Sequence, residues 1–205
     1  MRQTFLSTCA FVLVSSVAIA DTGLYEGVVD PNSSFVRVVT QDQTIATIGG
    51  ENIRDIDSGI SGYVNVMPGE IDVVLPTASE VIEVGPSSFY TVVFDADGEA
   101  EVFTDDITNS PSKADVSFYN LTDTADISVY VPQADAVALE AVGAMQGQSV
   151  AINAPLTLDF ELRAGDETLS SVSGVDLVRG AGVSIVLLES DQGYAAFATA
   201  NSYLK

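Results

Sequence analysis

The sequence predicts an all-β protein, and three observations support that prediction. Short runs of β-branched and aromatic residues alternate with polar residues at a period of two, the spacing that puts successive side chains on opposite faces of a strand. Gly, Pro, Asn, Asp or Ser, which favour turns, bound these runs. Hydrophobic residues make up 47% of the chain and charged residues 18%, a composition apolar enough for packed cores. We therefore predict two tandem small antiparallel β-sandwich domains after a cleaved signal peptide.

Residues 1–20 have the pattern of a secretory signal peptide. Arg2 supplies the positive charge, residues 5–19 form an apolar run, and residues 18–20 read Ala-Ile-Ala, which has the small residues of a cleavage site. The apolar run is shorter than the roughly 20 residues that a membrane-spanning helix needs. We therefore expect the chain to be exported to the periplasm, to be cleaved before Asp21, and not to span the membrane.

Residues 21–108 are predicted to form the N-terminal β-sandwich. Asp97-Gly98 lies between two apolar runs and is the strongest hairpin signal in the chain, because Asp-Gly readily adopts the backbone of a two-residue turn. The strands expected in this half cover residues 35–39, 63–67, 71–75, 89–94 and 99–103.

A polar, turn-rich stretch follows, and we place an inter-domain linker at residues 109–114. Residues 115–205 then form the predicted C-terminal β-sandwich. Its order of strands resembles that of the first half, which indicates a weak internal duplication. The Ala-rich segment 134–145 fits a strand or a helix about equally. The expected strands cover residues 116–120, 127–131, 156–162, 183–188 and 194–197.

The residue types that are missing argue against an enzyme. The chain has no histidine, so the usual acid/base at neutral pH and the commonest metal ligand are both absent. The single cysteine, Cys9, lies within the predicted signal peptide. Lys113 lies in the predicted linker and Lys205 at the terminus, so we expect neither to act as the base of a Ser-x-x-Lys pair. We therefore expect no catalytic residues, no cofactor and no metal site.

The net charge of −22 argues against nucleic acid as a partner. Nucleic-acid binding depends on Lys and Arg side chains that neutralise phosphates, and this chain has only seven basic residues against 29 acidic ones. Solubility is the simplest interpretation of such a surface.

Two short motifs have both a functional and a simpler interpretation. Asp21-Thr22-Gly23 and Asp57-Ser58-Gly59 match the triplet of aspartic peptidases, but the first stands at the predicted mature terminus and the second has the composition of a turn. An aspartic-type hydrolase is therefore a minor alternative. Asp95 and Asp97 alternate as ligands of a calcium loop do, but the twelfth position holds Asp106 in place of Glu. We interpret this segment as a hairpin turn, and weak calcium binding there stays open.

The N-terminal part of the predicted mature chain carries a family resemblance. Residues 24–38, from Leu24-Tyr25-Glu26 through Asp30-Pro31-Asn32-Ser33-Ser34 to Phe35-Val36-Arg37-Val38, resemble the opening of the AlgF family of periplasmic alginate O-acetylation proteins. Residues 88–93 and 119–123 are similar to further segments of that family. The resemblance implies two β-sandwich domains, a periplasmic location and a role that couples membrane-bound acetyl donor machinery to periplasmic acetyltransferases.

The function expected from the resemblance is that of a non-catalytic adaptor in O-acetylation of an exopolysaccharide, either alginate or a similar polymer. Its partners would be acetyltransferase components of a polysaccharide-modifying complex. Leu24, Tyr25, Phe35 and Arg37 are the predicted partner-binding patch, with the aromatic residues as anchors and Arg37 pairing with a partner carboxylate. In the simpler interpretation, Phe35 belongs to the core and Arg37 is the outward residue of a strand. The alternative function is a stand-alone exported β-sandwich with a binding or structural role.

Overall fold

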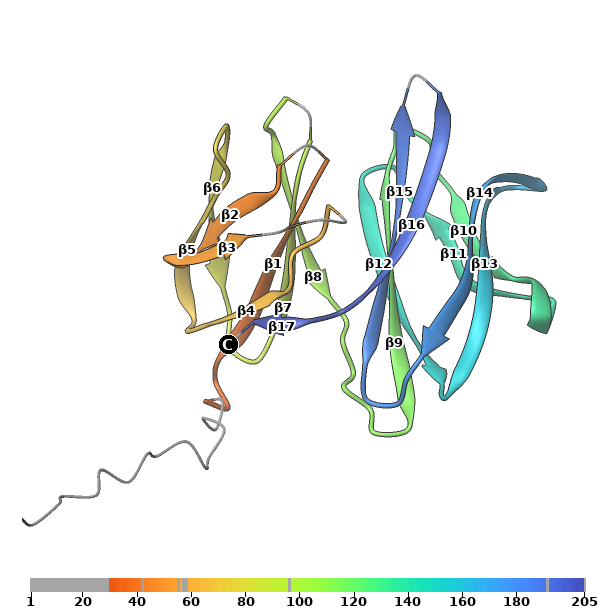
Figure 1. Cartoon of the computed structure of the whole chain (residues 1–205), viewed down its shortest axis with the longest axis horizontal. Helices are drawn as coiled ribbons and strands as arrows, with labels where there is room; N and C mark the ends of the chain where they lie inside the picture. The colour runs from red at the N-terminus through yellow and green to blue at the C-terminus, as the bar shows by residue number, and fades with distance from the viewer. Residues whose placement is uncertain are drawn as a thin grey trace, which may run out of the picture. The chain divides into compact units, whose positions relative to one another are not determined.

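The computed structural model describes residues 30–204, apart from residues 42, 55, 57, 58, 96 and 191 (Figure 1). The described chain consists of β-strands and one short 3₁₀ helix, η1 (Pro132–Ala134), so the all-β prediction is confirmed. Residues 31–205 group as one compact unit. The predicted signal peptide, together with Leu24 and Tyr25, lies outside the described residues. The domain boundaries at residues 108 and 115 stay predictions.

The strands of the first half form two sheets. Sheet A has the strand order β17-β4-β1-β7-β8, and sheet B has the order β3-β2-β5-β6. The strands are β1 (Ser34–Thr40), β2 (Ile45–Ile48), β3 (Glu51–Arg54), β4 (Tyr63–Val66), β5 (Gly69–Val74), β6 (Ser79–Val84), β7 (Phe89–Phe94) and β8 (Ala100–Asp105), with β17 (Tyr203–Leu204) joining from the end of the chain.

The second half also forms two sheets. Sheet C has the order β12-β9-β15-β16, and sheet D has the order β11-β10-β13-β14. The strands are β9 (Lys113–Leu121), β10 (Ile127–Val131), β11 (Ala136–Val142), β12 (Gln146–Asn153), β13 (Leu156–Ala164), β14 (Glu167–Leu177), β15 (Gly182–Ser190) and β16 (Gly193–Ala200). The segment whose type was left open by the sequence is therefore mostly the strand β11.

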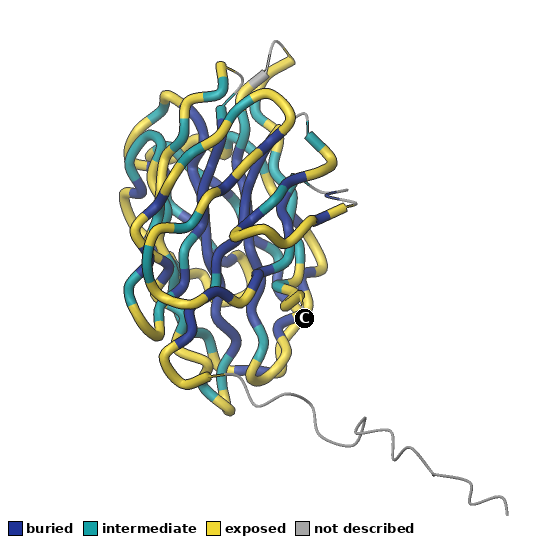
Figure 2. The backbone as a smooth tube through the Cα atoms, turned by 90° about the vertical axis from the view of Figure 1, so that its left-hand side faces the viewer, coloured by how far each residue is buried: buried dark blue, intermediate teal, exposed yellow. Residues whose placement is uncertain are grey.

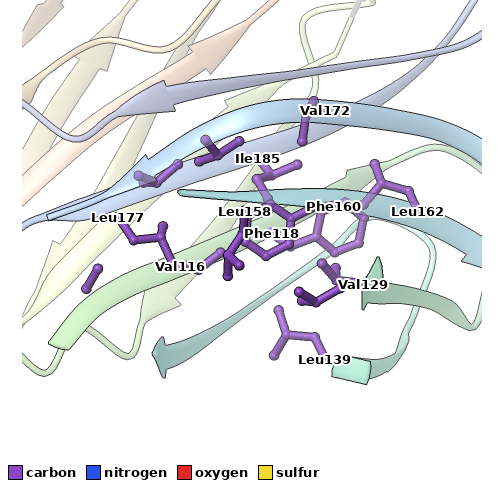
Figure 3. Packing of buried hydrophobic residues seen from close by; sticks show 14 of the residues in the cluster. Val116, Phe118, Val129, Leu139, Leu158, Phe160, Leu162, Val172, Leu177 and Ile185 are labelled. Atoms are coloured by element: carbon purple, nitrogen blue, oxygen red, sulfur yellow. The ribbon is translucent and has the colours of Figure 1, made fainter. Parts of the chain in front are cut away.

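Each half has its own hydrophobic core between its two sheets. Val36, Val38 and Val92 from sheet A pack with Ile48 and Val73 from sheet B. In the second half, residues of sheets C and D pack in the same way, as Figure 3 shows for Phe118, Phe160 and their neighbours. Figure 2 shows the buried segments, which include most of β1, β7 and β9, as dark blue stretches of the backbone.

The central strands of sheets A and C are buried on both faces. Every residue of β9 except Lys113 is buried, and every residue of β7 except Tyr90. A third cluster explains this, because it joins Val39 and Val93 of sheet A to Tyr119, Leu121 and Val186 of sheet C. The faces of sheets A and C that point away from their own cores are therefore packed against each other.

Among the described strands, most pairs are antiparallel, as expected, but three pairs are parallel. β1 pairs in parallel with β7, β9 with β15, and β17 with β4. The alternation of side chains is the same in both kinds of pair, so the sequence pattern carries no signal for them. The hairpin predicted at Asp97-Gly98 is present between β7 and β8.

Candidate functional site

Sheet A places two of the predicted patch residues on one face of β1. Phe35, Arg37 and Val39 alternate with the core residues Val36 and Val38, so they point away from the core of the first half. Their register partners on β7 are Phe89, Thr91 and Val93. The pair Phe35 and Phe89 is aromatic, the next pair is polar, and the third is aliphatic. The candidate site is built around the aromatic pair and the polar pair.

Arg37 is only 1% exposed, although arginine is rarely buried in proteins. Its Nε donates to Thr91 Oγ1 at 2.9 Å, its Nη1 to Asn201 Oδ1 at 2.9 Å, and its Nη2 to Tyr119 Oη at 2.6 Å. These partners come from β7, from the segment after β16, and from β9. The guanidinium therefore ties together strands of both halves.

Asp105, at the end of β8, supplies the opposite charge without contacting Arg37 as an ion pair. Its Oδ2 accepts hydrogen bonds from Tyr63 Oη at 2.9 Å and from Thr91 Oγ1 at 2.6 Å. Its Oδ1 accepts from Tyr119 Oη at 2.5 Å. The hydroxyls of Thr91 and Tyr119 each accept from Arg37 and donate to Asp105. We call Arg37, Tyr63, Thr91, Asp105 and Tyr119 the buried network.

Burial and charge act together on the pKa values of the buried network. Burial raises the pKa of Tyr119 to about 12, with Arg37 acting in the opposite direction. The pKa of Tyr63 is raised for the same reason. Burial would lower the pKa of Arg37, but the neighbouring Tyr119, Tyr63 and Asp105 outweigh it and the pKa is raised. The tyrosines therefore stay neutral and Arg37 stays charged at any physiological pH.

An aromatic cluster lies beside the buried network. We define it as Phe35, Tyr63, Phe89 and Tyr203. The ring of Phe35 stacks on Phe89 at 4.9 Å between centroids and meets Tyr203 edge-on at 5.6 Å. Tyr63 stacks on Tyr203 at 5.6 Å and meets Phe89 edge-on at 5.4 Å. The Arg37 Cζ lies 4.2 Å from the centre of the Tyr63 ring, so Tyr63 belongs to both groups.

The aromatic cluster has a buried side and a side that faces solvent. Tyr63 and Phe89 are buried, Phe35 is half-buried, and Tyr203 is 44% exposed. Partly exposed aromatic rings on a rigid backing are typical of protein-binding surfaces, because they contribute much contact area at little cost in conformational entropy. The candidate site is therefore the solvent-facing side of the aromatic cluster, supported from beneath by the buried network.

The structure brings Phe35 and Arg37 together but gives them different positions. Phe35 reaches the partly exposed cluster, whereas the Arg37 side chain is used inside the protein. A partner carboxylate for Arg37 and a role for Leu24 and Tyr25 stay predictions. Sequence reasoning missed six residues of the site, which are Tyr63, Phe89, Thr91, Asp105, Tyr119 and Tyr203.

The structure describes only some residues of the possible calcium loop and of the two peptidase-like triplets. Asp95 Oδ1 accepts hydrogen bonds from the backbone N–H groups of Asp97 and Glu99, which is how a carboxylate holds a turn. Asp57 and Ser58 lie outside the described residues. Across residues 30–204, apart from the six gaps, no group of three or more His, Cys, Asp or Glu side chains is placed to hold a metal ion. No helix in that part of the chain is long and apolar enough to cross a membrane.

The fold and the site define a class of all-β protein in which two similar sandwiches share a buried polar network and present an aromatic surface. Comparison with known proteins identifies the family. The family model described as "Alginate O-acetyl transferase AlgF" matches residues 6–184, so this chain belongs to the AlgF family. The resemblance found in the sequence is thereby confirmed.

One relative and one solved structure are similar to this chain. The alginate biosynthesis protein AlgF of Pseudomonas syringae pv. tomato is 25% identical over 186 residues, which are 87% of this chain and 83% of that protein. Among solved structures, the C-terminal domain of AlgF from P. aeruginosa is 22% identical, with a TM-score of 0.39. That match covers 44% of this chain and 99% of the solved domain.

Proposed function

We propose that this protein is a non-catalytic periplasmic adaptor in the O-acetylation of an exopolysaccharide, either alginate or a similar polymer. It would couple membrane-bound acetyl donor machinery to periplasmic acetyltransferases. The observation that carries the proposal is the family match over residues 6–184, since the family description and the P. syringae relative name alginate O-acetylation and alginate biosynthesis.

The composition supports a role in binding over a role in catalysis. Acyl transfer by a serine needs a base, and this chain has no histidine to act as one. The buried charged groups are also unsuited to catalysis, because Arg37 and Asp105 are 1% and 8% exposed and their hydrogen bonds are satisfied internally. In this proposal the family's transferase chemistry belongs to its partners.

The candidate site supports the adaptor proposal because it combines exposed aromatic rings with a rigid backing. The aromatic cluster offers apolar area to a partner, while the buried network fixes the strands that carry Phe35, Tyr63 and Phe89. A partner that docks on rigid rings loses less entropy than one that must order a flexible loop. The aromatic cluster is therefore our candidate docking surface for an acetyltransferase component.

The test is the acetyl content of the exopolysaccharide from a strain that lacks this gene, compared with the parent and a complemented strain. We expect the deletion to lower the acetyl ester content without lowering polymer yield, and complementation to restore it. Unchanged acetylation would remove the adaptor role and leave the stand-alone β-sandwich module as the better account.

Surface variants then test the site. Phe35→Ser should fail to restore acetylation while the protein still accumulates in the cell. Val81→Ser is the matched control, because this side chain is 57% exposed and belongs to β6 of sheet B, outside the aromatic cluster. Equal complementation by the two variants would show that the aromatic cluster is not the docking surface.

A further inference from the structure

The edge of sheet A at β4 is covered over only half of its length. β4 pairs with β1 on one side, and on the other side Tyr63 and Val64 pair with Tyr203 and Leu204 of β17. Tyr63 N–H donates to the Ser202 carbonyl at 2.7 Å. Within the described chain, Asn65 and Val66 have no strand partner on that side. An open strand edge of this kind is a template for another extended segment.

A groove continues along β4 from the point that β17 covers. Its volume is about 440 Å³, and Leu204 forms part of its lining together with Val64, Asn65, Val66 and Met67. Met67 is 55% exposed, so the groove has an apolar wall that no described residue covers fully. The backbone edge and the groove therefore form one continuous surface.

The residues of β17 show which side chains this surface accepts. Tyr203 lies in the aromatic cluster against Phe35 and Tyr63, whereas the next residue, Leu204, borders the groove. Consecutive side chains of a strand point to opposite faces, so the surface accepts an aromatic residue followed directly by an aliphatic one. Gly62 allows the close approach, because a Cβ there would lie 2.7 Å from Ser202 Oγ and 2.9 Å from Leu204 Cγ.

β17 is short and partly exposed, so it is bound only weakly to this surface. The strand has two residues, and Tyr203 and Leu204 are 44% and 37% exposed. The net charge of the chain is −22, which favours an occupant that carries positive charge, and the next residue after Leu204 is Lys205. A longer basic segment that continued past Val64 to Asn65 and Val66 would make more backbone hydrogen bonds than β17 does.

We propose that the β4 edge binds an extended, basic segment of an acetylation partner, with an aromatic residue followed by an aliphatic one, by parallel strand addition in place of β17. This inference rests on the proposed function and names the mode of docking at the same site. The chain's own β17 covers the edge until the partner displaces it.

A disulfide between β4 and β17 tests the displacement. Val64 and Leu204 are register partners, so Val64→Cys with Leu204→Cys places two cysteines at a separation that suits a disulfide. We expect the double variant to fail in restoring acetylation in the deletion strain, whereas each single variant restores it. The single variants control for the loss of either side chain.

A peptide provides a second readout that does not depend on acetylation. The probe is a labelled synthetic peptide with the sequence of residues 199–205, measured by fluorescence anisotropy against the purified double variant. We expect at least tenfold weaker binding to the oxidised than to the reduced protein, and weaker binding when Ser replaces the peptide's Tyr. The reduced form of the same chain controls for folding.

The outcomes separate this inference from the proposed function. If the double variant is fully oxidised and restores acetylation as well as wild type, displacement is wrong while the adaptor role stands. If the wild-type gene itself has no effect on acetylation, the adaptor role is wrong. The peptide-binding measurement then tests only whether the β4 edge binds an added strand. Equal binding of the peptide to the oxidised and reduced forms would overturn strand addition.

Discussion

The two halves of the molecule have the same arrangement of strands but differ on the faces they turn toward each other. The order β4-β1-β7-β8 in sheet A corresponds to β12-β9-β15-β16 in sheet C, and β3-β2-β5-β6 in sheet B corresponds to β11-β10-β13-β14 in sheet D. Even the parallel pairs correspond, since β1 lies beside β7 as β9 lies beside β15. This correspondence fits the internal duplication expected from the sequence.

The difference lies in the central pair of each shared face. In sheet A that pair is Arg37 with Thr91, and in sheet C it is Ser117 with Ser184. Sheet A also has the additional strand β17, for which sheet C has no counterpart among the described residues. The cores determine the common topology, whereas the central pairs outside the cores diverge and include a charged residue in sheet A but only serines in sheet C.

The largest effect should come from removing the charge that distinguishes sheet A. Arg37→Met leaves Asp105 buried without its compensating charge, and we expect a loss of about 3 to 5 kcal/mol in the free energy of unfolding. Chemical denaturation of the purified protein measures it. The corresponding change in sheet C, Ser117→Ala, removes a hydrogen bond to Ser149 and should cost about 1 kcal/mol. Similar losses for the two variants would show that the buried charge does not distinguish the halves.

The raised pKa of Tyr119 in the buried network predicts that the free energy of unfolding falls at alkaline pH. The pKa of Tyr119 is about 12 in the folded protein against about 10 for an unfolded chain, so the unfolded state loses this proton first as the pH rises. Stability should be unaffected by Tyr119 below pH 10 and should fall between about pH 10 and 12, by about 1.4 kcal/mol per pH unit.

Unfolding curves at several pH values test this limit. Tyr119→Phe should make the fall above pH 10 shallower. Phe160→Leu is the control, because Phe160 is a core residue of the second half, and its loss should lower stability at every pH without changing the slope. If Tyr119→Phe had the same slope as wild type, the raised pKa would be wrong.

The additional strand of sheet A provides a smaller test. Gly62→Ala introduces a Cβ that collides with Ser202 and Leu204, so it should loosen β17 at a cost of about 1 kcal/mol. Hydrogen exchange of the Tyr63 amide, which donates to Ser202, should become faster. Gly85→Ala is the matched control, since the nearest contact there is the Tyr90 hydroxyl at 3.4 Å. An unchanged exchange rate in Gly62→Ala would argue against the packing of β17 on Gly62.

The smallest effect is expected at the hairpin between β7 and β8. Asp95→Ala removes the acceptor for two backbone N–H groups of the turn, and we expect a loss of about 0.5 to 1 kcal/mol in thermal or chemical unfolding. Asp97→Ala, at an exposed position of the same turn, is the control and should have less effect. A larger loss for Asp97 than for Asp95 would contradict the assigned role.

The sequence predicts the parts of this structure that depend on local pattern. The β class, the hairpin at Asp97-Gly98 and most strands follow from alternation and turn residues. The consecutive apolar residues Val92, Val93 and Phe94 of β7 carry a further signal, because strands without alternation are typically buried on both faces. That signal could have indicated that sheet A packs on something beyond its own core.

The site depends on contacts between residues far apart in the chain, which no local pattern contains. Arg37 bonds to Tyr119 and Asn201, which lie 82 and 164 residues away. Phe35 was selected from the family resemblance and does belong to the aromatic cluster. Tyr203 could not be found in this way, because its position follows from the parallel pairing of β17 with β4.

The position of Asn201 and Tyr203 has a consequence for synthesis, in which the ribosome adds residues from the N-terminus onward. Sheet A lacks its fifth strand, and Arg37 lacks a hydrogen-bond partner, until residues 201–204 have been made. The first half therefore reaches its final packing only after every strand of the second half has been synthesised. Folding of the two halves is coupled in this order, although each half has its own hydrophobic core.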